Sequence, residues 1–351
     1  MDLVACRRVR FVANAATEGL MRREMVHMVR SMLVHARLTF RLHRFTLVAV
    51  SAMLILGSVA ALFVAFRLRG VGATPECLAS SYSFGPSDAS AACQASASEF
   101  RSIDGAWARP LMGALGGMAP LAGLLAGAGL VAREIEEGTA SVAWSLQPSR
   151  TRWLVGRVAP VAVLLLVLSA VASIAATELE RAQRPTIDAS LSFYNGSSHG
   201  LTPVAAGLVV FAAAVFAGSV VGRVLPALIV ASVLGLVLVA GVFASENVWF
   251  PGQTEIVDAR AASTGFPGAY VLDQKVQLAS GELKSLMDFN NLDWDANGNV
   301  RGLPEGAALV ALIIPGTRHP FVDEVEAAAM GVMAVCLLAA AAFVVRRRRP
   351  Y

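Results

Sequence analysis

A short stretch in the last third of the chain has the residue types of a calcium-binding loop. Carboxylate and amide side chains stand at alternate positions, as Asp293, Asp295, Asn297 and Asn299. Gly298 stands where an EF-hand loop turns sharply, but Pro304 takes the place of the bidentate glutamate that such a loop needs. An Asn-Gly turn between two short strands explains the same residues without a metal. We therefore assign no metal site and keep the four residues as a calcium candidate.

The sequence lacks the motifs of the common ATPases and metalloproteases. A Walker A loop requires a Gly-Lys pair followed by Ser or Thr. Only two lysines occur, Lys275 and Lys284, and neither stands in that setting. A His-Glu-x-x-His pair is also absent. We therefore expect no catalytic residues, no cofactor and no ATPase in this chain.

The segment 132–153 has the local signals of two helices joined by a sharp turn. Gly138 can end the first helix, because glycine readily adopts the left-handed conformation of a helix C-cap. Thr139 can cap a second, short helix of about 140–146, which Pro148 stops. A short helix held in this way could serve as a socket for a partner protein. The alternative is an ordinary turn between two helices.

The charged residues of the same segment suit either interpretation. Glu134 and Glu137 could offer carboxylates to basic side chains of a partner protein. Alternatively, the two carboxylates balance Arg133 and Arg150 across a solvated turn. Arg152 lies where a basic residue anchors a helix at a membrane surface.

Six apolar windows, each long enough to cross a bilayer, must position these groups. They run over about Phe45–Phe66, Pro110–Val131, Leu154–Ala176, Pro203–Val221, Leu225–Ala244 and Ala327–Val345. Such long windows cannot be strands, so the predicted fold is an all-α integral membrane protein with six transmembrane helices. Their apolar cores contain no Asp, Glu, His or Lys, which argues against an ion-coupled carrier.

The windows divide the chain into four parts. These are a leader (1–44) with an amphipathic interfacial helix at 26–44, helices one to five (45–244), an extracytoplasmic segment (245–326), and the last helix with a basic tail (327–351). The apolar run Ala307–Ile314 is too short to span, and we expect a re-entrant or packed segment there.

The distribution of charge predicts the orientation. With the N-terminus in the cytoplasm, the inside segments hold 18 arginines and six acidic residues, a net charge of +12, and the outside segments carry −8. Basic residues favour the cytoplasmic side, so we expect both termini there. Arg67 and Arg69, just after the first window, run against this trend.

Two further patterns concern packing. Cys77 and Cys93 share one outside loop, and an oxidising compartment favours a disulfide between them. Glycines four residues apart allow helices to approach closely; they occur as Gly113/Gly117, Gly123/Gly127 and Gly218/Gly222. These pairs could pack helices within the chain or join two protomers.

The connector resembles that of the ABC type-2 exporter permeases. Their connector reads Arg-Glu, an acidic residue, Gly-Thr, a tryptophan and then Ser/Thr-Arg, and this chain has Arg133-Glu134, Glu137-Gly138-Thr139, Trp144 and Ser149–Arg152. The stretch 37–44 looks like the amphipathic helix of the family, and Pro315–Phe321 is similar to a segment of actinobacterial-type members. The resemblance covers most of the chain from about residue 30, although the large segment before the last window departs from the family pattern.

This resemblance implies a membrane subunit that exports a lipid-like or amphipathic substrate. It implies a separate ATP-binding subunit holding ATP and Mg²⁺, a second permease protomer, and a bacterial plasma membrane as the location; no nucleic-acid partner is expected. The residues that it assigns to coupling with the ATPase are Arg133, Glu134, Glu137, Gly138, Thr139, Arg150 and Arg152. The alternative function is a membrane-anchored sensor or scaffold with an extracytoplasmic binding segment.

Overall fold

Six helices that are long and apolar enough to cross a membrane dominate the described part of the chain. The computed structural model describes residues 40–80, 90–146, 149–259, 266, 268–289, 293–294 and 300–348. The six helices are α2 (Arg44–Gly70), α5 (Arg109–Glu136), α7 (Arg150–Gln183), α8 (Thr202–Val221), α9 (Val224–Trp249) and α11 (His319–Arg347). Each apolar window of the sequence therefore falls within one helix. The amphipathic helix expected at 26–44 lies almost entirely outside the described residues.

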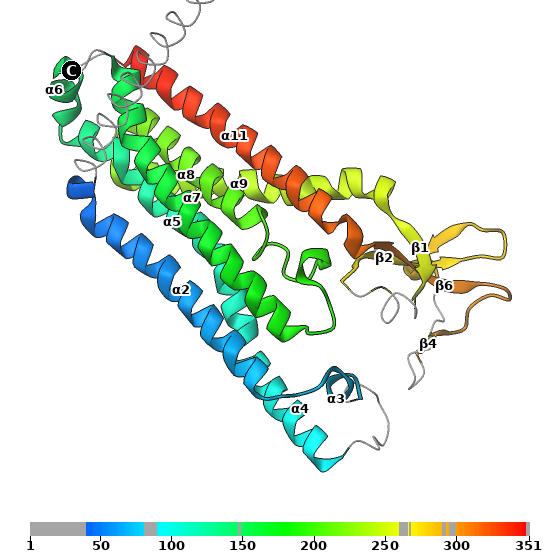
Figure 1. Cartoon of the computed structure of the whole chain (residues 1–351). Coiled ribbons are helices and arrows are strands. Elements are labelled where there is room, and N and C mark those ends of the chain that lie inside the picture. Colours follow the sequence, from blue (N-terminus) through cyan, green and yellow to red (C-terminus); the bar gives the residue numbers. More distant parts are fainter. Residues whose placement is uncertain are drawn as a thin grey trace, which may run out of the picture.

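The helices form an elongated bundle with two distinct ends (Figure 1). The short helix α6 (Thr139–Leu146) lies at what we call the connector end, together with the last turn of α11. The helix α3 (Pro75–Ser80) and the β-sheet lie at the opposite end, which we call the sheet end. Short 3₁₀ turns complete the connections at Ala189–Leu191, Phe250–Gln253, Leu286–Asp288 and Gly316–Arg318.

The second membrane-crossing helix begins much earlier than its apolar window. The helix α4 (Ala91–Ile103) continues through a π-helical turn at Asp104–Ala108 into α5, which gives one helix of 46 residues. The hydroxyl of Ser90 caps its start by accepting a hydrogen bond from the backbone N–H of Cys93 (3.3 Å). The π-helical turn ends two residues before Pro110. In a regular α-helix the proline ring would clash with the backbone carbonyl four residues earlier.

Glycine allows α8 to pack closely against α5. A Cβ atom at Gly123 would lie 2.2 Å from the carbonyl oxygen of Gly207, and one at Gly127 would lie 2.7 Å from that of Phe211. Both neighbours are backbone atoms of α8, so they cannot move aside as a flexible side chain could. This glycine pair therefore packs helices within the chain, which is one of the two roles that the sequence allowed.

The other glycine pair of α5 faces away from this contact. A Cβ atom at Gly113 or Gly117 would meet nothing within 4 Å. Leu121 and Leu125, one and two turns further along, are 45% and 39% exposed. We call these four residues the open stripe of α5, because none of the described residues covers it.

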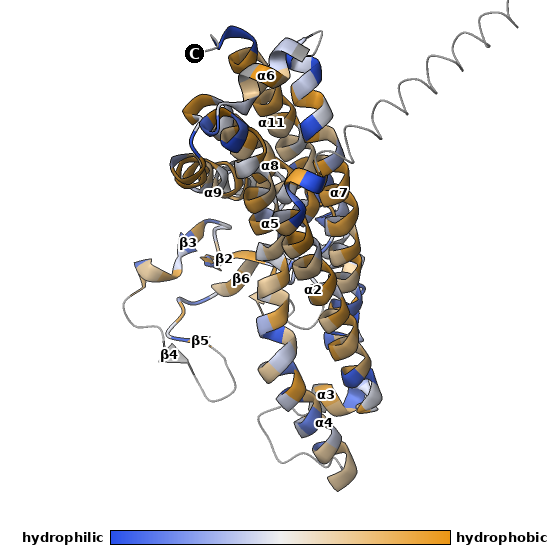
Figure 2. Ribbon diagram, turned by 90° about the vertical axis from the view of Figure 1, so that its left-hand side faces the viewer, coloured by the Kyte–Doolittle hydropathy of each residue, from blue (hydrophilic) through white to orange (hydrophobic). Residues whose placement is uncertain are grey.

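The lateral surface of the bundle is apolar. Figure 2 shows hydrophobic residues along the lengths of the helices and hydrophilic residues gathered toward their ends. Large side chains such as Phe63, Leu236 and Val335 are 60–71% exposed. A water-soluble monomer rarely exposes so much continuous apolar surface, whereas lipid is a suitable solvent for it.

The extracytoplasmic segment expected from the sequence contains an antiparallel sheet, so the description as all-α is incomplete. The strands β1 (Glu255–Asp258), β2 (Tyr270–Gln277), β3 (Leu283–Ser285) and β6 (Ala308–Ile314) lie in the order β1-β6-β2-β3. The short apolar run before the last helix is therefore strand β6, with Ile313 and Ile314 fully buried. β1 and β2 pair with its two edges. Side chains on both of its faces are buried, as Val310 and Ala311 and then Ile313 and Ile314 show, so an apolar run suits it better than a polar/apolar alternation.

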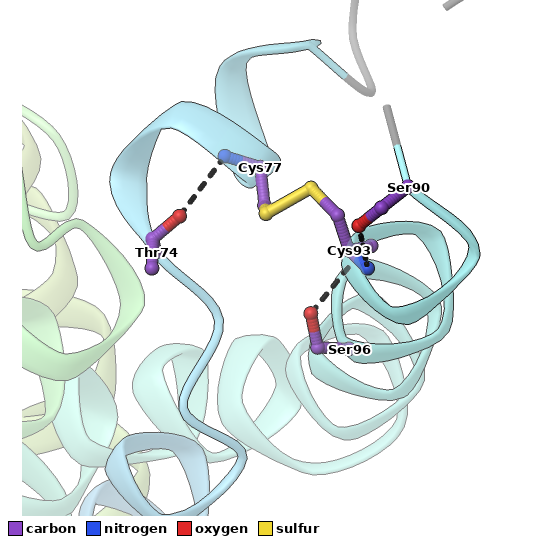
Figure 3. The surroundings of a disulfide bond; sticks show 5 residues. All are labelled: Thr74, Cys77, Ser90, Cys93 and Ser96. Carbon is purple, nitrogen blue, oxygen red and sulfur yellow. Dashed lines mark hydrogen bonds between the residues drawn. A yellow bond between two sulfur atoms is a disulfide. The ribbon is translucent and has the colours of Figure 1, made fainter. Parts of the chain in front are cut away.

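A disulfide joins the two segments that follow α2. Cys77 in α3 and Cys93 in α4 are bonded, with their Cα atoms 5.4 Å apart (Figure 3). The backbone N–H of Cys77 donates to the hydroxyl of Thr74 (3.4 Å), which holds the first turn of α3. The bond therefore closes the loop between the first two membrane-crossing helices, where the sequence predicted it.

The glycine contact gives a test of the bundle packing. We expect Gly123→Ala to lower the free energy of unfolding by about 1–3 kcal/mol, because the added methyl group would overlap the α8 backbone. Gly129→Ala is the matched control on the same helix, and it should cause no loss because a Cβ atom there would meet nothing within 4 Å. Thermal unfolding of both variants in detergent would measure the difference, and equal stabilities would contradict the close contact.

Candidate functional site

The connector between α5 and α7 forms a rigid turn around a short helix. Gly138 follows the last turn of α5 with φ +72°, the left-handed conformation that favours glycine. The helix α6 begins at Thr139, one residue before the predicted start, and ends at Leu146 as predicted. The hydroxyl of Ser149 then caps α7 by accepting from the backbone N–H of Arg152 (3.2 Å).

Thr139 stabilises the turn in a different way from the expected N-cap. Its hydroxyl donates to the backbone carbonyl of Glu134 (3.2 Å), which lies in the last turn of α5. Carbonyls at the end of a helix have no partner within the helix. The hydrogen bond therefore satisfies such a carbonyl and ties the start of α6 to the end of α5.

Three of the predicted charged residues face solvent. Arg133 and Glu137 form an i,i+4 ion pair with 2.8 Å between Nε and Oε1, and their side chains are 58% and 52% exposed. Arg152 is also exposed. Since an exposed pair contributes little to stability, these groups are available for contact with another molecule.

Glu134 lies in a different environment, which corrects its expected role. Its carboxylate forms an ion pair with Arg157 of α7 at 2.9 Å, and both side chains are only 9% exposed. The position is one helical turn after the buried Leu130, so it belongs to the core-facing side of α5. Glu134 therefore links α5 to α7 and does not present a carboxylate to a partner.

The start of α2 borders this ion pair. His43, the residue that precedes α2, is buried, and its Nε2 atom has no hydrogen-bond partner among the described residues. Burial lowers the pKa of His43, and the nearby charges of Arg157 and Arg133 lower it further. We therefore expect a neutral imidazole at neutral pH, packed where three helices meet.

Aromatic contacts fix α6 against α7. The rings of Trp144 in α6 and Trp153 in α7 meet edge to face, with their centroids 5.9 Å apart. The guanidinium of Arg150 lies 4.8 Å from the centroid of the Trp144 ring. The helix is thus held on one side while the side chain of Val142 stays 61% exposed.

The end of α11 is joined to the same connector. The guanidinium of Arg150 donates to the backbone carbonyls of Arg346 (3.3 Å) and Arg348. The side chain of Arg348 in turn donates to the carbonyl of Ser219 near the end of α8 (2.7 Å). Arg150 therefore acts within the chain, and the basic tail is part of the connector end.

One residue of the connector was missed by the sequence interpretation. The carboxylate of Glu136 accepts a hydrogen bond from the backbone N–H of Val224 at 2.9 Å, and so caps the start of α9. No local pattern could have found this contact, since 88 residues separate the two groups.

The calcium candidate is only partly described. Asp293 lies in strand β4 (Asp293–Trp294), opposite Arg301 of β5 (Val300–Arg301). Asp295, Asn297 and Asn299 lie outside the described residues. Among the residues that the structure does describe, no group of three or more His, Cys, Asp or Glu side chains could hold a metal ion.

Comparison with known families yields a match over the helical bundle. A family model described as ABC-2 membrane transporter related matches residues 45–246, from the start of α2 almost to the end of α9. The match covers more than half of the chain and includes the whole connector. No curated protein and no solved structure matches the chain.

The buried ion pair gives a second test. We expect Glu134→Gln to lower the free energy of unfolding by about 3–5 kcal/mol, because Arg157 would keep its charge in a buried site without a partner. Glu137→Gln, which removes an exposed carboxylate three residues away, should have little effect. Chemical unfolding in detergent would compare them. If the two variants lost equal stability, the buried pair would not be the link between α5 and α7.

Proposed function

The chain belongs to the ABC-2 membrane transporter related family, and on this premise we propose that it is the permease subunit of an ATP-driven exporter. A separate ATP-binding subunit would supply ATP hydrolysis with Mg²⁺, since this sequence has no Walker A motif. The proposal places the chain in a bacterial plasma membrane with both termini in the cytoplasm. The cargo would be lipid-like or amphipathic, in keeping with the apolar lateral surface of the bundle.

The braced helix α6 is the observation that carries the proposal. One side of it is fixed by the contacts of Trp144 with Trp153 and Arg150. The exposed Val142 lies on α6, and the exposed pair Arg133–Glu137 lies just before it. An apolar side chain beside charged groups suits a protein interface with a polar rim, so we assign this surface to the ATP-binding subunit.

The bracing would convert docking into movement of the helices. A displacement of α6 would reach α5 through the Thr139 hydrogen bond and α7 through the tryptophan pair. The Glu134–Arg157 ion pair would keep α5 and α7 moving together. In this account Glu134, Thr139 and Arg150 position the connector, whereas Arg133, Glu137 and Arg152 contact the partner.

The open stripe of α5 supports the presence of a second permease protomer. Its glycines leave the helix backbone accessible, and close backbone approach is a common basis for helix association in lipid. The two exposed leucines that continue the stripe would add apolar contact. We extend the proposal to a homodimer or heterodimer that meets along this stripe.

Partner docking is testable on native membranes. We expect the tagged chain to co-purify with a protein that carries a Walker A motif, and Val142→Asp to abolish this association by placing a charge in the apolar part of the interface. Val271→Asp is the matched control, since Val271 is also exposed but lies in β2 at the sheet end.

Both variants should fold and insert normally, because neither residue is buried. Retention of the ATP-binding protein by Val142→Asp, or its loss from both variants, would show that α6 is not the docking surface. Quantitative mass spectrometry of the purified complexes would distinguish these results.

The orientation is tested by cysteine labelling of intact cells. In a background without Cys6 and Cys336, Ser280→Cys near the end of β2 should react with a membrane-impermeant maleimide. Ser145→Cys in α6 should react only after the cells are opened; both positions are exposed in the structure. Labelling of Ser145→Cys in intact cells would show that the topology is the reverse of the one proposed. The connector could then not dock to a protein in the cytoplasm.

A further inference from the structure

A cluster of buried polar groups lies at the sheet end, where α8 and α11 begin. Asp323 of α11 accepts hydrogen bonds from the backbone N–H groups of Leu201 and Thr202, both at 2.8 Å. It also accepts from the hydroxyl of Thr202 at 2.7 Å. Asp323 thus caps the positive N-terminus of α8, and its charge has a structural purpose.

Glu326, one turn further along α11, has much weaker hydrogen bonding than Asp323. Its residue is 7% exposed, and its Oε2 atom lies 3.1 Å from the hydroxyl of Thr202. That hydroxyl has a single proton, which the shorter contact assigns to Asp323. Among the described residues the carboxylate of Glu326 therefore has only a donor that it shares with Asp323, and a buried carboxylate with so little hydrogen bonding is unfavourable.

Two histidines beside the cluster each donate one hydrogen bond to a backbone carbonyl. Nε2 of His199 lies 3.0 Å from the carbonyl of Tyr194, and Nδ1 of His319 lies 3.1 Å from that of Ser190. Carbonyls only accept, so these two nitrogens donate. Burial lowers the pKa of His199, which keeps it neutral at neutral pH. In a neutral His319 the other ring nitrogen, Nε2, is an acceptor.

The carboxylate of Glu326 lines a cavity of about 250 Å³ between the loop 193–197, α8, α9, α11 and the sheet. Four aromatic rings contribute to its wall: Phe193, Phe243, Phe250 and Tyr270. His319 and both carboxylates also line it, but no lysine or arginine does so among the described residues. The cavity therefore combines aromatic faces and hydrogen-bond acceptors with negative charge that no cation balances.

We propose that this cavity binds an organic cation that carries an amine. Its ammonium group would donate to Glu326 and to Nε2 of His319, and the aromatic rings would contact both the cation and its hydrocarbon part. A volume of this size accommodates a small ligand or the head of a longer amphipathic amine. The site lies at the opposite end of the bundle from α6, and it does not depend on the proposed transport function.

Phenethylamine is a suitable probe, and 2-phenylethanol is its neutral control of nearly identical shape. We expect calorimetry on the purified full chain in lipid nanodiscs to detect binding of the amine and not of the alcohol. Empty nanodiscs would correct for partition of either compound into lipid. Equal binding of both compounds, or no binding of the amine, would overturn the proposal without any variant.

A pair of variants then locates the site. Glu326→Gln should weaken amine binding by about tenfold or more, because it removes the charge that receives the ammonium group. Glu324→Gln removes the same charge from an exposed position two residues away, and it should bind as the unaltered chain does. Equal affinities of the two variants would place the amine elsewhere and overturn the assignment. If Glu326→Gln did not fold, the comparison of amine with alcohol on the unaltered chain would decide.

Discussion

The buried ion pair between Glu134 and Arg157 constrains the connector from within. A buried pair of charges is tolerated only when both members stay together, because either charge alone would lack solvation. The last turn of α5 and the first turns of α7 are therefore held at a fixed separation. The connector must fit between these two helix ends. It does so through Gly138 in the left-handed conformation, the short helix α6 and the contact of Trp144 with Trp153. An ion pair in the interior thus fixes the position of the exposed surface of α6.

The two sides of α5 differ in how closely they are packed. One side of the helix approaches α8 so closely that glycine is required at Gly123 and Gly127. The opposite pair, Gly113 and Gly117, lies in the open. Identical spacing of one residue type therefore occurs in a tightly packed and in an open environment, and only the presence of a neighbouring helix distinguishes them.

The features predicted from the sequence are those that depend on local patterns. The six apolar windows, the short helix after Gly138 and the pairing of Cys77 with Cys93 all follow from composition, turn chemistry or compartment. The errors arise where distant residues decide the outcome. Glu134 looked available for docking because its partner, Arg157, is 23 positions away on another helix.

The sheet and the polar cluster illustrate the same limit. The run that became strand β6 is too short for a span, but its partners β1 and β2 lie on either side of it and could not be known in advance. No sequence pattern distinguishes the carboxylates of Asp323 and Glu326 from that of the neighbouring Glu324. Their role depends on Thr202, which is more than 120 positions away.

The helix α8 connects the two functional ends of the molecule. At the connector end its last turn receives the side chain of Arg348, and the backbone of Arg348 is itself held by Arg150. At the sheet end its first turn is capped by Asp323 beside the proposed amine site. Asp323 lies near the start of α11, and Arg348 directly follows its last residue. The two helices α8 and α11 are therefore held together at both ends. A packed pair of helices held in this way would move as a unit. Under the proposed function, a displacement of the connector would therefore carry Thr202 and Glu326 together and shift both relative to Phe243 of α9 and Tyr270 of β2, which also line the cavity. Occupancy of the amine site and the state of the connector would then be thermodynamically linked, and each would bias the other by the same free energy.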